Sequence, residues 1–434
     1  MMRLFALCLV VSSLAAFAQE DAGVAEPAPP AATTPPPAAP APAPTALGVL
    51  ETLFQFARPY ATIKPTVIAS SGAVESYSQP NATAITAAAN PVISTLADQP
   101  RLSFQVGQSR AGLWFNEKGQ VRGQLEFDFV DFSKASPTVA SLPRVRIAKL
   151  EWAPSEKFSL QAGQDWDLHA PVNPHGGNLV GARFLSGNAA FMRQQIKALG
   201  RVGDFELAAA VGMQGVNATA KDAAFELSMV PTVAVRAAWL VGKGRVGLSG
   251  IATSLRLGLG TTNERRAFSG GGSLFADVTF GRTTFRGELN AGQNLANIGL
   301  LTLAYGNTAK DIAEWGGFLS ARHGFTDMHF IYANAGLMRV INRDAVVPSY
   351  AYPTVPMDGS APAMSTAALA GTGPGILHNG GATLGYELRI NKNLAFMLEG
   401  FFLWTEHKLN AFDLERVSSI RQAFGGELCG YVSF

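Results

Sequence analysis

Alternation of apolar and polar residues is the feature that most limits what this chain can fold into. From Val121 to Phe129 the odd positions are apolar or glycine and the even positions are all polar, and the same split recurs from Phe285 to Asn290. A side-chain period of two is that of a β-strand with unlike faces, whereas an amphipathic helix repeats every 3.6 residues. The chain from Arg58 onward is therefore expected to consist of strands.

Alternation is compatible with two architectures. A soluble sandwich turns its apolar face inward, whereas a membrane barrel turns that face to lipid and its charges to a watery interior. The connections separate the two, because short and long ones alternate. Short turns are expected at residues 117–119, 154–157, 200–204, 242–245, 281–282, 323–327 and 391–393, and long loops at 72–100, 133–141, 167–190, 214–224, 257–267, 292–311, 341–379 and 408–417. Seven turns and eight loops predict an all-β transmembrane antiparallel barrel of about sixteen strands.

Composition agrees with a membrane barrel. Only 15% of the residues are charged, where about 25% is usual in soluble proteins, and the mean hydropathy is +0.14. Beyond residue 18 no run of about 18 uncharged apolar residues occurs, which excludes helical membrane spans. The net charge of +2 is far from the strongly basic composition of nucleic-acid-binding proteins, so no nucleic-acid partner is expected.

The N-terminal part divides into three segments before the barrel. Residues 1–18 have a signal peptide's pattern: Arg3, an apolar stretch, and a small-x-small site ending at Ala18. Residues 19–45 form a Pro/Ala-rich linker, which cannot bury a core. Residues 46–57 predict either a short helix, because leucines recur at near-helical spacing, or a disordered lead-in. The barrel is expected to span residues 58–434.

The C-terminal end carries a further signal. The chain ends Gly-Tyr-Val-Ser-Phe, and Phe424, Leu428 and Val432 share a strand face with Phe434. Removal of the signal would leave Cys429 as the only cysteine, so no intrachain disulfide is expected. The ending resembles the last strand of outer-membrane proteins, whose terminal aromatic residue is read by the barrel-assembly machinery.

The stretch from Arg58 to Phe434 resembles bacterial outer-membrane porins. Leu160 to Trp166 (LQAGQDW) is similar to the strand end that precedes the constriction loop in trimeric porins, the DcaP-like family among them. The resemblance implies a homotrimer in the outer-membrane lipid of a Gram-negative bacterium, without catalysis or cofactor, that passes small hydrophilic solutes. It also implies that the third loop, Asp167 to Ala190, folds into the lumen and narrows it.

Charged side chains are the candidate selectivity residues, since lumen charges sort passing ions. Alternation places seven cations on the polar faces of their strands: Arg122, Arg144, Arg146, Arg193, Lys197, Arg236 and Arg286. Their acidic counterparts are Glu126, Asp128, Asp165 and Glu288, while the third loop adds Asp167 and Arg183. The porin resemblance implies that Arg122, Arg144 and Arg146 face Asp165 and Asp167 across the lumen. Because Arg and Lys outnumber Asp and Glu among the early-strand lumen positions, the solutes are expected to be anionic. The alternative is a solvated wall in which no single charge matters.

Other functions remain open on the sequence alone. A substrate-selective channel would use the same lumen charges, and a barrel enzyme or adhesin would use the external loops, the longest running from Ile341 to Asn379. Asp165, Asp167, His169 and His175 have a spacing that could suit a metal, but their Pro- and Gly-rich surroundings are typical of a loop, and no metal is expected. None of the six histidines lies in a recognisable catalytic motif, so no enzyme activity is expected.

Overall fold

The described part of this computed structural model comprises residues 56–72, 100–129, 143–178, 181–213, 230–257, 262, 264–303, 310–346, 375–408 and 420–434. These residues form eighteen strand segments: β1 (Ala57–Ile63), β2 (Thr66–Ser70), β3 (Arg101–Gln105), β4 (Arg110–Phe115), β5 (Val121–Asp128), β6 (Arg144–Ser155), β7 (Phe158–Trp166), β8 (Met192–Val202), β9 (Phe205–Gly212), β10 (Thr232–Val241), β11 (Gly244–Leu257), β12 (Arg265–Phe280), β13 (Thr283–Gln293), β14 (Ala313–Gly324), β15 (His329–Val340), β16 (Ile376–Arg389), β17 (Leu394–His407) and β18 (Ile420–Ser433). Two short 3-10 helices, η1 (Leu295–Ile298) and η2 (Arg343–Ala345), lie in connections.

Two pairs of segments are each one interrupted strand. β1 pairs with β4 and β2 pairs with β3, so the break at Lys64 and Pro65 lies opposite the break between β3 and β4. Pro65 has no N–H to donate to a ladder, and the backbone N–H of Lys64 donates instead to the Ser109 hydroxyl at 3.0 Å. The described segments therefore make up sixteen barrel strands, as predicted.

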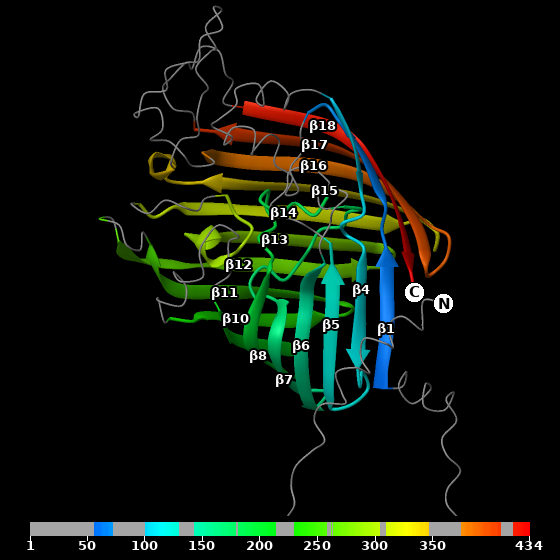
Figure 1. Ribbon diagram of the computed structural model, residues 1–434, viewed down its shortest axis with the longest axis horizontal. Coiled ribbons are helices and arrows are strands. Elements are labelled where there is room, and N and C mark those ends of the chain that lie inside the picture. Colours follow the sequence, from blue (N-terminus) through cyan, green and yellow to red (C-terminus); the bar gives the residue numbers. More distant parts are fainter. Residues whose placement is uncertain are drawn as a thin grey trace, which may run out of the picture. The chain divides into compact units, whose positions relative to one another are not determined.

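The sheet closes on itself, as Figure 1 shows in the ring of strands from β1 to β18. All strand pairs are antiparallel, and the last strand meets the first: Thr62 of β1 lies opposite Ser433, and Val67 of β2 lies opposite Leu428. Closure leaves no unpaired edge facing lipid. All seven predicted short turns lie between consecutive strands at one end, and the long loops connect them at the other.

The two faces of the wall are inverted relative to a soluble protein. Leu150, Leu319 and Leu384 project outward and are largely exposed, whereas Glu126, Asp128 and Asn290 are buried on the inner face. This is the lipid-facing and water-facing arrangement that the alternation predicted. Cys429 is a buried free thiol in β18.

The N-terminal predictions fall largely beyond the described residues. The signal peptide (1–18), the linker (19–45) and nearly all of the expected helix (46–57) are not described, and Ala57 already belongs to β1. Within the described ranges, the structure has no helix long and apolar enough to cross a membrane.

Candidate functional site

The connection from β7 to β8, residues 167–190, lies inside the barrel and is called the lumen loop below. Leu168, His169 and Ala189 are fully buried although they belong to a connection. Its backbone contacts inward-facing residues of β13 to β17, on strands far from its own β7 and β8. The loop therefore folds into the lumen, as the porin resemblance implied.

Polar side chains of the barrel wall bind the backbone of the first half of the lumen loop, residues 172–177. Glu288 of β13 accepts a hydrogen bond from the Val172 N–H at 3.4 Å. Ser320 of β14 accepts one from the His175 N–H at 3.0 Å, and Glu399 of β17 accepts one from the Gly177 N–H. Because a buried peptide group needs a partner, these three side chains fix the path of the loop across the lumen.

Asparagines hold the same loop through its carbonyl groups. Asn290 of β13 donates to the Gly187 carbonyl at 2.9 Å, and Asn334 of β15 donates to the His175 carbonyl at 2.7 Å. Asn379 of β16 donates to the Leu185 carbonyl at 3.0 Å. Alternation placed Asn290 on the polar face of its strand, and Asn379 was expected at the end of the longest loop, but none of the three asparagines was assigned to the site from the sequence.

Glycines of the inner wall make room for the loop. A Cβ at Gly336 of β15 would lie 2.2 Å from the Ser186 carbonyl oxygen, and a Cβ at Gly381 of β16 would lie 2.2 Å from Nη1 of Arg183. A side chain at Gly336 would require the loop backbone to shift, and one at Gly381 would displace the Arg183 guanidinium. The loop and this part of the wall are therefore in direct van der Waals contact, with no open passage between them.

Apolar side chains pack the lumen loop against the barrel wall near the end of the barrel that carries the long loops. Phe184 and Ala189 belong to one buried cluster with Leu303, Met338 and Val340. The backbone contributes as well, because the connection between β13 and β14 exchanges hydrogen bonds with the lumen loop at 3.1 and 3.2 Å. The lumen loop is therefore fixed to the barrel wall near the long-loop end by both apolar packing and backbone hydrogen bonds.

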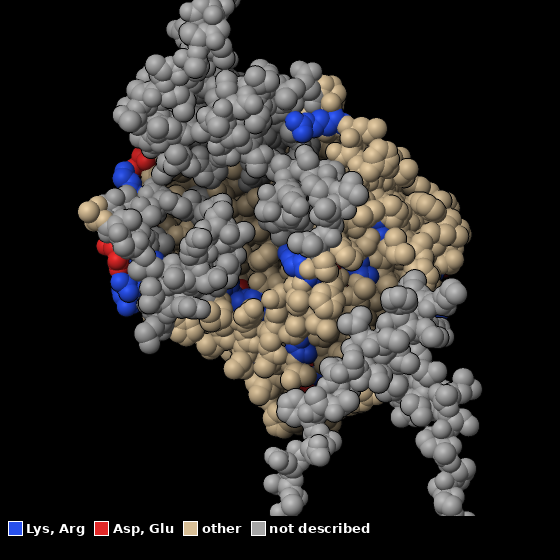
Figure 2. All heavy atoms as spheres, in the orientation of Figure 1, with Lys and Arg blue, Asp and Glu red and all other residues tan. Residues whose placement is uncertain are grey.

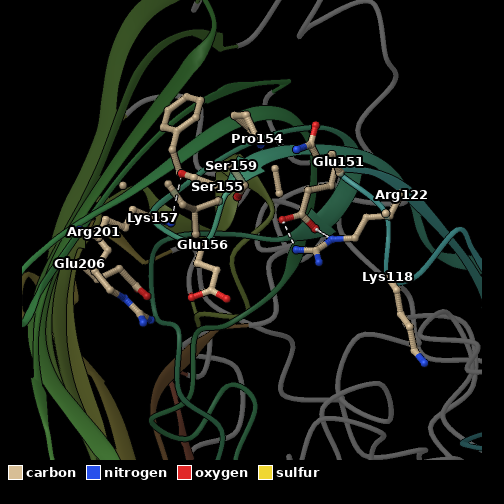
Figure 3. A pocket seen from close by; sticks show the side chains of 16 residues that line it. Lys118, Arg122, Glu151, Pro154, Ser155, Glu156, Lys157, Ser159, Arg201 and Glu206 are labelled. Carbon is tan, nitrogen blue, oxygen red and sulfur yellow. Dashed lines mark hydrogen bonds and ion pairs between the residues drawn. The ribbon is translucent and has the colours of Figure 1, made fainter.

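Arg122 lies at the short-turn mouth rather than beside the lumen loop. It donates to Glu151 of β6 at 2.8 Å, and it lines a hollow of about 520 Å³ formed around the turns that follow β4, β6 and β8 (Figure 3). Lys118, Lys157 and Arg201 also line this hollow. The hollow is thus a charged vestibule at the mouth of the channel.

Arg144 and Arg146 are paired within the early wall. Arg144 donates to Asp128 of β5 at 2.7 Å, and Arg146 bonds to Glu126 and stacks over the Trp166 ring at 5.2 Å. Neither contact involves the lumen-loop carboxylates that the resemblance implied.

The predicted acidic partners also bind elsewhere. Asp165 belongs to β7 and pairs with Lys149 at 3.0 Å and with Lys197 at 2.8 Å, while Asp167 pairs with Arg193 at 2.5 Å. The expected opposition of Arg122, Arg144 and Arg146 to Asp165 and Asp167 is therefore corrected. Asp165 stands on the same side of the barrel as the arginines, because β7 is adjacent to β6, which carries Arg144 and Arg146, and is two strands from β5, which carries Arg122.

The two remaining candidates lie on or under the lumen loop. Arg183 is fully buried, donates to Asn334 at 2.6 Å and is placed to hold the loop rather than to meet a passing ion. Arg286 of β13 pairs with Asp277 at 3.2 Å and remains partly exposed. Of the predicted set, Arg122, Arg144 and Arg286 are therefore the side chains most open to the lumen.

Exposure within the ion pairs is unequal. Arg144 is 28% exposed and its partner Asp128 is 3% exposed, and Arg122 and Glu151 differ in the same sense at 35% and 11%. Arg322 and Glu387 follow at 19% and 2%. In these pairs the carboxylate is recessed into the wall and the guanidinium covers it, so the surface offered to a solute is positive.

Three groups in the wall hold two cations around one carboxylate. Asp165 is shared by Lys149 and Lys197, Glu206 by Arg236 and Arg245, and Glu387 by Arg322 and Arg389. Each group carries a formal excess of one positive charge. Away from the left-hand rim of Figure 2, the charged side chains that can be seen are mainly Lys and Arg.

His175 lies on the lumen loop in a setting that opposes protonation. Burial, followed by the nearby Arg286 and Arg322 charges, lowers its pKa from 6.5 to about 3. Its ring nitrogen Nδ1 lies 3.1 Å from the Ser320 hydroxyl. No group of three His, Cys, Asp or Glu side chains able to hold a metal occurs among the described residues.

A closed sixteen-stranded barrel with a connection folded into its lumen defines a porin-type fold. No protein-family model and no curated protein matches the chain. Solved structures do: the outer membrane channel DcaP of Acinetobacter baumannii is similar over 87% of this chain and 97% of that one, with a TM-score of 0.63 at 10% identity.

Two further solved structures agree. OprB of Pseudomonas putida has a TM-score of 0.54 at 9% identity, covering 90% of this chain and 96% of that one. An anion-selective porin from Comamonas acidovorans has a TM-score of 0.52 at 12% identity, covering 87% and 99%. At these identities the likeness shows the fold.

Proposed function

We propose that the chain is an outer-membrane porin, a water-filled channel for passive diffusion of small polar solutes, with a preference for anions. The barrel and its folded-in loop support the channel. The observation that carries the anion preference is the unequal exposure of three ion pairs, Arg122 with Glu151, Arg144 with Asp128 and Arg322 with Glu387, in which guanidiniums cover recessed carboxylates.

A permeating ion responds to the charges nearest its path. Salt screens charges over about 8 Å at physiological ionic strength, which is comparable with the dimensions of a porin lumen. An ion near Arg322 therefore meets the exposed cation first and the recessed Glu387 behind it. The local excess of positive charge lowers the energy of an anion and raises that of a cation.

The same proposal includes location and assembly. DcaP is an outer membrane channel and the Comamonas acidovorans protein is a porin, which supports an outer-membrane location in a Gram-negative bacterium with lipid around the barrel. A homotrimer and recognition by the barrel-assembly machinery are proposed from the sequence resemblance. For the latter, Phe434 is exposed and its N–H bonds to the Ala61 carbonyl at 2.9 Å, so the last residue continues the ladder.

Planar-bilayer recording tests the proposal on the full mature chain. We expect stepwise conductance that rises linearly with salt, and a reversal potential of anionic sign in a potassium chloride gradient. Folded protein that inserts without conductance would contradict the porin assignment. A cationic reversal potential would contradict the anion preference but not the channel function.

A further inference from the structure

The outer face of β14 to β16 carries a basic and aromatic cluster near the long-loop ends. Trp315, Arg339 and His378 stand directly opposite one another on the three strands. The Trp404 ring meets the His378 ring edge-on, with centroids 5.7 Å apart. We call these four residues the rim cluster.

Arg339 is the unusual member of the rim cluster, because it is exposed and has no ion-pair partner among the described residues. The nearest carboxylate along the same row is Glu406, two strands away, and Arg343 binds it. An arginine on the lipid face costs free energy that grows with its depth in the bilayer. A counter-charge from outside the described residues would offset that cost.

Toward the middle of the same strands the outer face is hollowed into an apolar groove. Small residues floor it: Ala321, Ala333, Ala335, Ala382 and Gly400. Larger apolar residues stand around them: Phe285, Leu319, Leu384, Phe402 and Phe424. The groove has a volume of about 950 Å³. Gly380 lies two residues beyond His378, between the rim cluster and the groove, and the Trp404 ring packs over it.

The spacing of these features fits one leaflet of a membrane. Ala333 is six residues from Arg339, which is about 20 Å along a strand and about 14 Å in depth at a tilt of about 45°. That depth is close to half of a hydrocarbon core of about 30 Å. His329, which contacts Tyr386 at 2.6 Å, is ten residues from Arg339 and about 24 Å away in depth, near the opposite boundary.

We propose that this face binds an anionic, phosphate-bearing membrane lipid of the leaflet on the long-loop side. The phosphate lies at Arg339 and His378, and one acyl chain lies in the groove. Arginine binds phosphate oxygens through charge-assisted hydrogen bonds, and tryptophans such as Trp315 and Trp404 favour the headgroup level. The proposal requires a membrane-embedded barrel but is independent of the ion preference of the channel.

Lipid binding to the full-length protein in detergent tests this. Nondenaturing mass spectrometry would count bound phosphatidylglycerol and phosphatidylcholine of equal chain length, and thermal unfolding would report stabilisation by each lipid and by inorganic phosphate alone. We expect phosphatidylglycerol to bind and raise the Tm more than phosphatidylcholine does, and inorganic phosphate to have no effect.

Two variants separate the parts of the site. Arg339→Gln should weaken phosphatidylglycerol binding roughly tenfold or more, because a charged hydrogen bond is lost. It should weaken phosphatidylcholine binding less, because the choline cation of that lipid already neutralises its phosphate. Ala335→Phe should fill the groove and weaken both lipids. The matched control is Arg266→Gln, an exposed arginine of β12 away from the groove, which should retain wild-type binding.

Three results would overturn the proposal. One is equal binding of the two lipids to the wild type, and another is undiminished phosphatidylglycerol preference in Arg339→Gln. The third is a groove occupied by a second copy of the chain, seen as an oligomer that Ala335→Phe disrupts while lipid binding persists. Lipid-free Tm and gel mobility equal to wild type identify each variant as folded.

Discussion

The Oδ2 atom of Asp167 lies 2.5 Å from Nε of Arg193, and this pair joins the two ends of the lumen loop. The Asp167 N–H also donates to the Phe191 carbonyl at 2.9 Å. Both charged side chains are buried, and removing one partner of a buried pair typically costs about 3–5 kcal/mol because it leaves an unpaired charge.

Asp167→Asn is therefore expected to loosen the base of the loop. We expect a lower unfolding temperature and larger, noisier single-channel conductance than wild type. Arg282→Gln, which breaks the exposed Arg282 and Asp327 pair at a short turn, is the control and should change neither by a measurable amount. Unaltered conductance in Asp167→Asn would mean that the loop is held without this pair.

A side chain on the inner wall should displace the loop directly. Gly336→Val places atoms where the Ser186 carbonyl now lies, so we expect the loop to leave the β15 wall and the conductance to change. Gly400→Val is matched, because Gly400 is also in a late strand but a Cβ there meets nothing closer than 4.0 Å. Equal conductance in the two variants would contradict the described contact between loop and wall.

Acid should release the loop through His175. Its pKa is lowered to about 3 in the folded state and is near 6.5 when solvated, so the seated loop binds fewer protons than a displaced one. The seated loop is thus increasingly disfavoured as pH falls from about 6.5 toward 3. Around it stand Arg286, Arg322, Ser320 and Asn334, none of them acidic.

Single-channel recording at stepwise lower pH measures this release. We expect closures or conductance changes that begin below about pH 6 and that shift to lower pH in His175→Gln, where the titrating ring is absent. An identical acid response in that variant would assign the effect to other groups.

Deletion of Phe434 tests assembly. Secretion should be intact, while insertion into the outer membrane should fall, because the terminal aromatic residue and its bond to Ala61 are lost together. Phe424→Ala, an outward-facing aromatic change in the same strand, serves as the control. Full insertion of the truncated chain would show that Phe434 is no assembly signal.

Strands and turns could be predicted because their signals are local. Period-two stretches such as Val121 to Phe129 and turn residues such as those at 242–245 lie within a few positions of one another. The pairing of charges could not be predicted in the same way. Charge pairing depends on strand register and on the path of a long connection, and local sequence patterns determine neither.

A β-bulge explains why Lys149 was not predicted to be an ion-pair partner of Asp165. The register of β5 and β6 shifts between Glu126 and Phe127, so the inward positions of β6 change from even to odd numbers. Lys149 therefore faces inward with Arg144 and Arg146, although strict alternation places it outside, and it binds Asp165. The β1 and β3 interruptions likewise escaped prediction, since two coincident breaks preserve the overall count.

The most direct test of the account is the reversal potential of Arg245→Gln/Arg322→Gln/Arg389→Gln in a potassium chloride gradient. This triple variant removes Arg245, the more exposed of the two cations at Glu206, and both cations at Glu387. Its control is Lys310→Gln/Arg58→Gln/Arg282→Gln, which removes three cations that are each more than half exposed and belong to exposed ion pairs. We expect an anionic reversal potential in the wild type and the control, and a clear shift toward cations in the first variant. A wild-type reversal potential in the first variant would contradict the claim that exposed guanidiniums over recessed carboxylates set the selectivity of the channel.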